Sequence, residues 1–215
     1  MLKQIILVFA TLAISTVAFA QPQNFYQIGF AANLNIGDSE FNISNDGTNG
    51  GFYPNTLGAG NICVNVYTFD PSEEMVSCCA CLVTPNALVS LSAKNDLINN
   101  VLTPAIPTSI VIKLVASTPG TATGGVFTVC NPTIVPAIGA DEDGTLAWGT
   151  TLEPASTAGT YSPVSVPFII GSLPTTFTDG EINQLASVCA PVQAEGTGYG
   201  VCSSCALGAL SGTKQ

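Results

Sequence analysis

Apolar and polar residues alternate along the segment NFYQIGFAANLNIGD, residues 24–38. The even-numbered positions carry the apolar side chains Tyr26, Ile28, Phe30, Ala32, Leu34 and Ile36. A two-residue period places every second side chain on the same side of an extended chain, which is typical of a β-strand with one buried face. A strand over 26–36 would extend about 36 Å at about 3.3 Å per residue, roughly twice the usual length. We therefore expect a long N-terminal strand.

The rest of the chain contains shorter segments of the same character. They are rich in β-branched, aromatic or alternating residues and are separated by Gly, Asn, Asp and Pro: 41–43, 62–69, 75–84, 87–93, 109–117, 126–130, 146–152 and 164–170. Such segments predict strands joined by turns, although 87–93 also fits a helix. Residues 109–117 are almost continuously apolar, which predicts a central strand, and Pro167 predicts a sheet edge or bulge. The pattern predicts an all-β fold, a β-sandwich with jelly-roll topology as one form of it.

One short helix is predicted near the C-terminal end. Thr178 and Glu181 have the spacing of a capping box, in which two side chains satisfy backbone groups at the start of a helix. Apolar residues then recur at helical spacing up to Cys189, and Ala190-Pro191 is expected to end the helix.

The first 20 residues have the features of an export signal. Lys3 provides a positive start, residues 5–17 are apolar, and Ala-Phe-Ala at 18–20 is a small-x-small cleavage site. We expect 1–20 to be a signal peptide and the mature protein to be secreted, extracellular or at the cell surface. No later stretch of about 18 apolar residues predicts a helix that inserts into a membrane.

Removal of the signal peptide leaves 195 of the 215 residues, enough for one large all-β domain or two small ones, and we favour one. The chain has no internal repeat and no long linker between two domains. We divide it into a signal peptide (1–20), a donor-like N-terminal strand (21–37) and a single disulfide-rich β-sandwich domain (38–215).

The charge of the protein excludes several functions. It has no histidine and no arginine, and its basic residues are Lys3, Lys94, Lys113 and Lys214. The mature chain therefore has three lysines against 14 acidic residues, a formal charge of −11. Without a basic patch to neutralise phosphates, neither nucleic acid nor an anionic membrane is an expected partner. The missing imidazole excludes Ser-His-Asp and Cys-His catalysis, CxxCH haem attachment and histidine-ligated metals.

Enzymatic chemistry would have to use carboxylates alone. A glycosidase needs two facing acids, for which the candidates are Glu73, Glu74, Asp141, Glu142, Asp143, Glu153 and Glu181. Most of these lie beside Gly, Pro or Ser in predicted turns, where solvated carboxylates are ordinary. With one tryptophan, Trp148, and five tyrosines, the sequence indicates no aromatic cleft. We predict a protein that is not an enzyme, with no catalytic residue, no metal and no cofactor.

Eight cysteines follow the signal peptide: Cys63, Cys78, Cys79, Cys81, Cys130, Cys189, Cys202 and Cys205. In an exported chain an even number predicts up to four disulfides, for which about 105 pairings exist. Cys189, on the apolar face of the predicted helix, is expected to pair with Cys202 or Cys205. Cys78-x-x-Cys81 and Cys202-x-x-Cys205 also have the spacing of a tetrathiolate zinc site or of redox centres, although no thioredoxin-like pattern surrounds them.

Three blocks resemble sequences in a group of uncharacterised secreted Cys-rich bacterial β proteins: NICVNVYTFDPSEEMVSCCACLVTPN, LAWGTTLEP and EINQLASVCAPVQAEGTGYGVCSSC. Together they cover about a third of the mature chain. That group has no established activity, so the resemblance implies none. A second resemblance concerns architecture: an alternating strand directly after the signal peptide resembles the N-terminal extension of donor-strand pilins, which usually have far fewer cysteines.

We therefore predict a structural subunit of an extracellular, pilus-like filament, a homopolymer of this chain. The six apolar side chains of residues 26–36 would form the subunit interface, because an incoming strand satisfies the free backbone groups of a neighbour's sheet. Head-to-tail addition does not close, so it propagates. The alternative is pairing of this strand within its own domain. The chain would then be a monomeric secreted or surface β-sandwich that binds glycan or protein.

Overall fold

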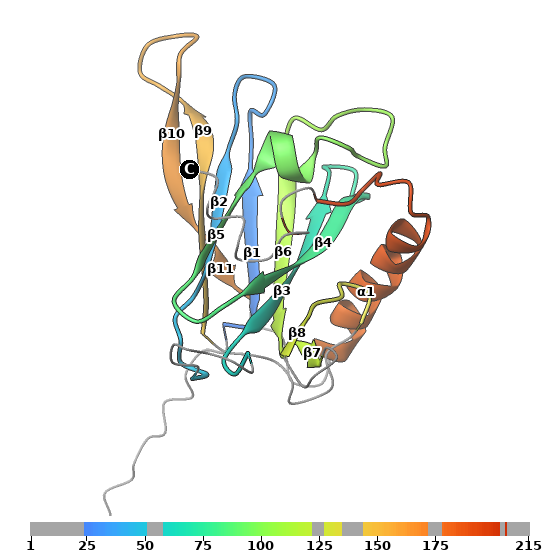
Figure 1. Cartoon of the computed structure of the whole chain (residues 1–215). Coiled ribbons are helices and arrows are strands. Elements are labelled where there is room, and N and C mark those ends of the chain that lie inside the picture. The colour runs from blue at the N-terminus through green and yellow to red at the C-terminus, as the bar shows by residue number, and fades with distance from the viewer. Residues whose placement is uncertain are drawn as a thin grey trace, which may run out of the picture.

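The computed structural model of the protein describes residues 24–50, 58–121, 127–134, 144–171, 178–202 and 205. The predicted signal peptide, residues 1–20, lies outside the described residues. The described strands form two main antiparallel sheets, and one α-helix lies against one of them (Figure 1). The all-β sandwich with a C-terminal helix predicted from the sequence is therefore confirmed.

Sheet A has five strands in the order β11-β1-β6-β3-β4. Its strands are β1 (Tyr26–Ala31), β3 (Ile62–Phe69), β4 (Met75–Val83), β6 (Ile110–Ser117) and β11 (Ile169–Ile170). The predicted strand at 109–117 is β6, and it occupies the central position that its continuous hydrophobicity predicted.

Sheet B has four strands in the order β10-β9-β2-β5. Its strands are β2 (Glu40–Asn45), β5 (Leu88–Ser92), β9 (Thr145–Pro154) and β10 (Tyr161–Pro167). The β9–β10 hairpin extends beyond the neighbouring strands (Figure 1). The remaining described strands are β7 (Gly120–Thr121) and β8 (Phe127–Val129), which pair with each other. A π-helical turn, η1 (Ala93–Leu97), follows β5.

The hydrophobic core lies between the two sheets. Alternate residues of β6, among them Ile112 and Leu114, face sheet B and are 1% exposed. Phe41 and Ile43 of β2 face them from sheet B and are at most 2% exposed. Alternation along the strands thus produces the buried inner faces, as the two-residue period requires.

β1 lies inside sheet A of its own chain. It pairs with β6 along its whole length and with the two residues of β11 on its other side. The strand begins at Tyr26, as predicted, but ends at Ala31 rather than Ile36. Asn33 adopts a left-handed backbone conformation, φ 59°, and the chain turns there. In the single chain, residues 26–31 are therefore part of the sandwich and not a separate arm.

β1 also lacks the single buried apolar face that its alternating sequence predicted. Tyr26 is 2% exposed, but Phe30 on the same face is 46% exposed at the outer surface of sheet A. The polar residue Gln27 is buried on the opposite face, toward sheet B, where its side-chain amide donates a hydrogen bond to the carbonyl of Thr145 at 2.6 Å. Hydrogen bonding explains why this polar side chain is tolerated in the core.

The chain passes from sheet B to sheet A at Phe168. β10 pairs with β9 as far as Pro167, the N–H of Phe168 donates to the carbonyl of Ala147 at 3.2 Å, and β11 then pairs with β1. A strand that changes sheets forms a corner of a sandwich. Pro167 lies at the end of the edge strand β10, directly before this corner, which confirms the sheet edge or bulge predicted from the proline.

Helix α1 (Thr178–Ala194) packs on the outer side of sheet A beside β4 (Figure 1). It begins at the predicted residue but does not end at Ala190-Pro191, because Pro191 lies inside its last turns. The side-chain amide of Gln193 donates to the carbonyl of Cys78 at 2.9 Å, so the helix remains packed beyond the proline. Within the described residues, no helix is long and apolar enough to cross a membrane.

All eight cysteines are paired, which confirms the four predicted disulfides. The bonds are Cys63–Cys130, Cys78–Cys189, Cys79–Cys202 and Cys81–Cys205. The expected pairing of Cys189 with Cys202 or Cys205 is wrong. Cys189 faces the outer side of β4, where Cys78 points, and the segment after α1 reaches the other side of the same strand.

This segment also covers the free edge of β4 at Cys78. The N–H of Cys78 donates to the carbonyl of Gly200 at 2.8 Å, and Cys78 forms a parallel bridge with Val201. Covered edges do not recruit further strands. The last described residues are therefore attached to β4 by backbone hydrogen bonds as well as by disulfides.

Candidate functional site

A groove of about 720 Å³ lies between α1 and the outer face of sheet A. Phe69 of β3, Met75 of β4 and Val111 of β6 line it on the sheet side, and Leu185 and Val188 line it on the helix side. Ligand sites in proteins commonly have about 300–1,000 Å³ and a largely apolar lining. We call this feature the α1 groove and treat it as the candidate functional site.

The register of sheet A builds the apolar floor of the α1 groove. Phe30 of β1 lies opposite Val111 of β6, which in turn lies opposite Phe69 of β3. Cross-strand neighbours on one face contact each other, so the three side chains form a continuous row. Phe30 and Val111 are 46% and 38% exposed, and Val188 of α1 is 41% exposed. The row continues an apolar surface from the groove toward β1.

Acidic side chains surround this apolar floor. Asp70 and Glu73 line the groove from the turn between β3 and β4, and Glu181 lines it from the first turns of α1. Lys113 of β6 is the one basic side chain among the lining residues. The lining therefore has three carboxylates against one ammonium group, which gives it a net negative charge.

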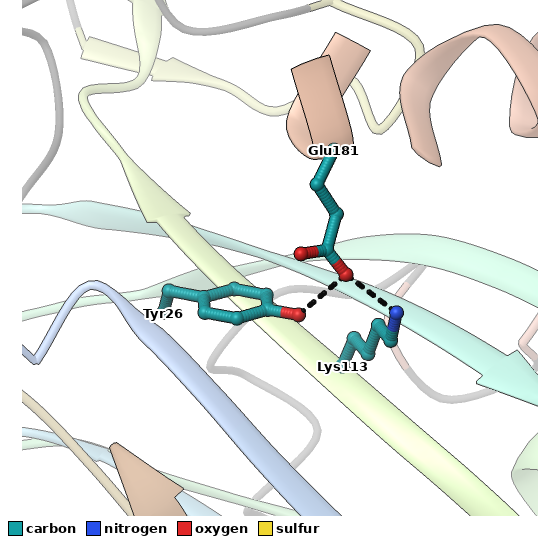
Figure 2. Close-up of polar contacts among 3 residues, drawn as sticks. All are labelled: Tyr26, Lys113 and Glu181. Carbon is teal, nitrogen blue, oxygen red and sulfur yellow. Dashed lines mark hydrogen bonds and ion pairs between the residues drawn. The ribbon is translucent and has the colours of Figure 1, made fainter. Parts of the chain in front are cut away.

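Lys113 and Tyr26 both bind Glu181 at one side of the groove (Figure 2). The Tyr26 hydroxyl donates to Oε1 of Glu181 at 2.8 Å, and Nζ of Lys113 donates to the same oxygen at 2.5 Å. Nζ of Lys113 also lies 5.3 Å from the ring centroid of Phe69. The cluster joins β1, β6 and α1, and therefore fixes the helix relative to the sheet.

The environment of this cluster sets its protonation. Burial alone raises the pKa of Glu181, but the hydrogen bonds from Lys113 and Tyr26 and the charge of Lys113 outweigh burial and hold the pKa below its ordinary value. Burial, together with the hydrogen bond to Glu181 and its negative charge, raises the pKa of the Tyr26 hydroxyl. At neutral pH the site thus contains an ionised glutamate and a protonated tyrosine.

The groove contains some of the acids that the sequence offered as catalytic candidates. Of the candidate acids, the structure brings Glu73 and Glu181 to the same groove. A general acid needs a raised pKa, and the pKa of Glu181 is lowered. Residues 141–143, which hold three further candidates, lie outside the described residues. What the groove offers a ligand is an apolar floor and fixed negative charge.

No protein-family model, curated protein or solved structure matches this chain. The resemblances inferred from the sequence blocks therefore stay predictions, and a functional assignment rests on the geometry of the described residues.

The six predicted interface residues divide between the strand and the turn that follows it. Tyr26, Ile28 and Phe30 share the outer face of β1, toward α1 and the groove. Ala32, Leu34 and Ile36 lie beyond the strand: Leu34 is 2% exposed and donates its N–H to the carbonyl of Thr108 at 2.8 Å, and Ile36 is 52% exposed. A contact of these residues with a second chain stays a prediction.

Sequence reasoning missed the link between Lys113 and Glu181. Lys113 was recognisable only as a basic residue in an apolar strand, and Glu181 only as part of a capping box and as one of several candidate acids. The two residues are 68 positions apart, and no local pattern connects a strand to a helix across that distance. A lone lysine in the most hydrophobic strand of a lysine-poor chain was the available signal.

A second, polar hollow of about 360 Å³ lies on the outer face of sheet B. Asp38, Glu40, Asp96, Ser90, Ser92 and Thr150 are among its lining residues. Trp148, 38% exposed, lies opposite Asn42 on the same face. Glycan binding, the other function expected of such a fold, stays a prediction. Substitution of Trp148, the exposed aromatic side chain of this face, would test it.

Proposed function

We propose that this protein is an exported, non-catalytic β-sandwich that binds a basic, partly apolar segment of another polypeptide in the α1 groove. The observation that carries the proposal is the combination of an exposed apolar floor with three carboxylates in one groove. Export is supported by the sequence of residues 1–20 and by four disulfides, which persist in oxidising compartments.

The apolar side chains favour a partner that covers them. Phe30, Val111 and Val188 each expose more than a third of their surface within a single region of the molecule. Contiguous exposed apolar surface with a polar rim is typical of an interaction site. Burial of this surface would supply the free energy of binding, and the carboxylates would select the partner by charge.

The charge of the groove indicates a basic partner from a different protein. One of its carboxylates, Glu181, is paired with Lys113, so Asp70 and Glu73 contribute unbalanced negative charge. The mature chain has no arginine and three lysines, one of which is Lys113 itself. A second copy of this chain therefore has little positive charge to offer, whereas a segment with several Lys or Arg residues fits the site.

Binding of two labelled peptides tests the proposal. An alternating Lys–Leu octapeptide should bind the mature protein, and more weakly as salt is raised, while the matching Glu–Leu octapeptide should not bind. Val188→Asn should weaken binding of the Lys–Leu peptide by about tenfold or more, since it places an uncharged polar group in the apolar wall. Val164→Asn, at a comparably exposed valine on β10, is the matched control and should have no effect. Equal binding of both peptides would contradict the proposal.

The filament predicted from the sequence is a second candidate function, and the position of β1 favours it. β1 is the first described strand after the predicted signal peptide, and β11 holds one side of it through two residues only. Transfer of β1 into a neighbouring chain would keep the same contacts in trans, as in domain swapping. Because β1 pairs with β6 and β11 of its own chain, this proposal ranks second.

A covalent lock on β1 tests the filament. Phe30 and Val111 are directly opposed and both exposed, so Phe30→Cys with Val111→Cys should form a disulfide that keeps β1 in its own sheet. The filament proposal expects fibres of the natural chain in electron micrographs and discrete particles of the locked variant. Fibres of the locked variant, or discrete particles of the natural chain at high concentration, would overturn strand exchange.

A further inference from the structure

We infer that Cys79, Cys81, Cys202 and Cys205 together form a second, independent site: a tetrathiolate site for a tetrahedral divalent ion of the Zn²⁺ class, which becomes available when the two disulfides among them are reduced. Within the described residues, Cys79, Cys81 and Cys205 are the one group of three or more Cys, Asp or Glu side chains whose ligand atoms all lie within 4.8 Å of one another. Cys202 joins them through its bond to Cys79.

Strand geometry decides which cysteines belong to the site. Successive side chains of a strand point to opposite faces, so Cys79 and Cys81 share one face of β4 and Cys78 lies on the other. Cys78 is accordingly bonded to Cys189 of α1 on the outer side. The Cys78-x-x-Cys81 spacing that suggests a zinc site in the sequence is therefore misleading, because its first cysteine points away from the cluster.

The backbone keeps Cys202 beside β4 when the disulfides open, and Cys205 follows it three residues later in the chain. Cys202 directly follows Val201, which is bridged to Cys78, and the carbonyl of Gly200 accepts a hydrogen bond from the N–H of Cys78 at 2.8 Å. Neither interaction depends on the Cys79–Cys202 or Cys81–Cys205 bond. All four cysteines are at most 5% exposed, so the site would be shielded from water.

The sulfur positions match the size of a tetrahedral site. Zn–S bonds of about 2.3 Å in a tetrahedron separate neighbouring sulfurs by about 3.8 Å. Bonded sulfurs are about 2 Å apart, so each pair must open by roughly 2 Å, and the Cys79 sulfur already lies within 4.8 Å of the sulfurs of Cys81 and Cys205. Side-chain rotation can supply a movement of this size.

Reduction and metal binding balance as two separate steps. Each S–S bond is reduced by one phosphine, which takes up the oxygen of one water molecule. The products are two thiols and one phosphine oxide, so two phosphines release four thiols. The ion then replaces up to four thiol protons as four metal–sulfur bonds form. The disulfide-bonded and metal-bound states exclude each other because both use the same four sulfurs.

Two variants with four cysteines each provide the test. Both carry Cys63→Ser, Cys130→Ser and Cys189→Ser. One adds Cys78→Ser and keeps the four proposed ligands, and the other adds Cys79→Ser and keeps the Cys-x-x-Cys spacing at 78 and 81. After phosphine reduction, Co²⁺ is titrated, and its visible tetrahedral thiolate bands and proton release are followed. The proposal expects one Co²⁺ per chain in the first variant, bound about tenfold or more tightly than in the second.

Equal binding by the two variants, or tighter binding by the variant that retains Cys78, would overturn the site. Such a result is expected if Co²⁺ binds an unfolded chain, in which the adjacent positions 78 and 79 are equivalent. The reduced natural chain gives an independent measurement. Zn²⁺ should raise its unfolding temperature, since the site exists in the folded state. An unchanged or lower unfolding temperature, as produced by binding to the unfolded chain, would also overturn the proposal.

Discussion

The ring of Phe168 packs directly against the backbone of Gly29, at the corner where the chain passes from sheet B to sheet A. The same ring lies edge-to-face against Phe41, with the ring centroids 5.9 Å apart. Gly29 faces the inside of the sandwich from β1, so Phe168 fills the space that a larger residue would occupy. This contact ties β1 of sheet A to the strand that leaves sheet B.

Gly29→Ala should therefore destabilise the protein by about 1–3 kcal/mol, the usual cost of inserting a methyl group into a packed core. The added Cβ would lie 2.4–2.6 Å from three atoms of the Phe168 ring, and that ring is also packed edge-to-face against Phe41. The free energy of unfolding from denaturant titration measures the change.

Gly180→Ala is the matched control for that substitution. Gly180 lies in α1, and nothing approaches the position of an added Cβ within 4 Å. Alanine is the better helix former, so this variant should be as stable as the natural chain or slightly more stable. Similar effects of the two substitutions would show that Phe168 does not pack against Gly29 as described.

The Glu181 cluster should make stability depend on pH in the acidic range. Because the folded-state pKa of Glu181 lies below its ordinary value of about 4.5, its contribution is fully present above that value and is lost as pH falls through the folded-state pKa. Glu181→Gln should lower stability at neutral pH by about 1 kcal/mol, a modest figure because both partners are partly exposed. The difference from the natural chain should shrink as the pH is lowered.

Denaturant titrations at several pH values between neutral and strongly acidic check this dependence. Glu195→Gln changes an exposed glutamate just beyond α1 and should leave both stability and its pH dependence unchanged. A constant difference between the natural chain and Glu181→Gln at every pH would contradict the role given to the Lys113 and Tyr26 contacts.

The Cys78–Cys189 disulfide should be the main covalent restraint on α1. It closes a loop between residues 111 positions apart, and the chain-entropy argument assigns such a bond about 3–5 kcal/mol. Replacement of both cysteines by alanine should lower the free energy of unfolding by an amount in this range and increase amide hydrogen exchange in α1. A loss below about 1 kcal/mol, with unchanged exchange, would mean that packing alone holds the helix.

Much of the fold was predictable because strands leave a local pattern in the sequence. Residues 62–69 and 75–84 correspond to β3 and β4, and the continuous hydrophobicity of 109–117 correctly predicted a central strand. The helix start at Thr178 was also predictable from the capping residues. Each of these features depends on residues that are close in the sequence.

The errors arose where contacts between distant residues decide the structure. The alternation of 26–36 shows that a strand forms but not which face meets the second sheet, and the buried hydrogen bond of Gln27 decides this. The helix continues through Pro191 because its last turn is bonded to β4, through the hydrogen bond from the Gln193 side chain to the Cys78 carbonyl. Disulfide pairing depends on which face of β4 each cysteine points to, and Cys-x-x-Cys spacing does not encode this.

The candidate site was the least predictable part. Its floor comes from β3, β4 and β6, its wall from α1, and its charge from the turn between β3 and β4. Glu73 and Glu181 could each be recognised from the sequence as candidate acids, but their common groove exists only after the sheet and the helix have packed together.

Charge reversal at two adjacent glutamates tests the proposed function most directly. Glu73 lines the α1 groove and Glu74 does not, although both lie in the same turn and both substitutions change the net charge equally. At low salt, Glu73→Lys should weaken binding of the Lys–Leu octapeptide by about fivefold, as loss of about 1 kcal/mol predicts, and Glu74→Lys should change Kd by less than about twofold. Equal effects of the two substitutions would mean that any binding reflects the overall negative charge, which would contradict recognition in the α1 groove.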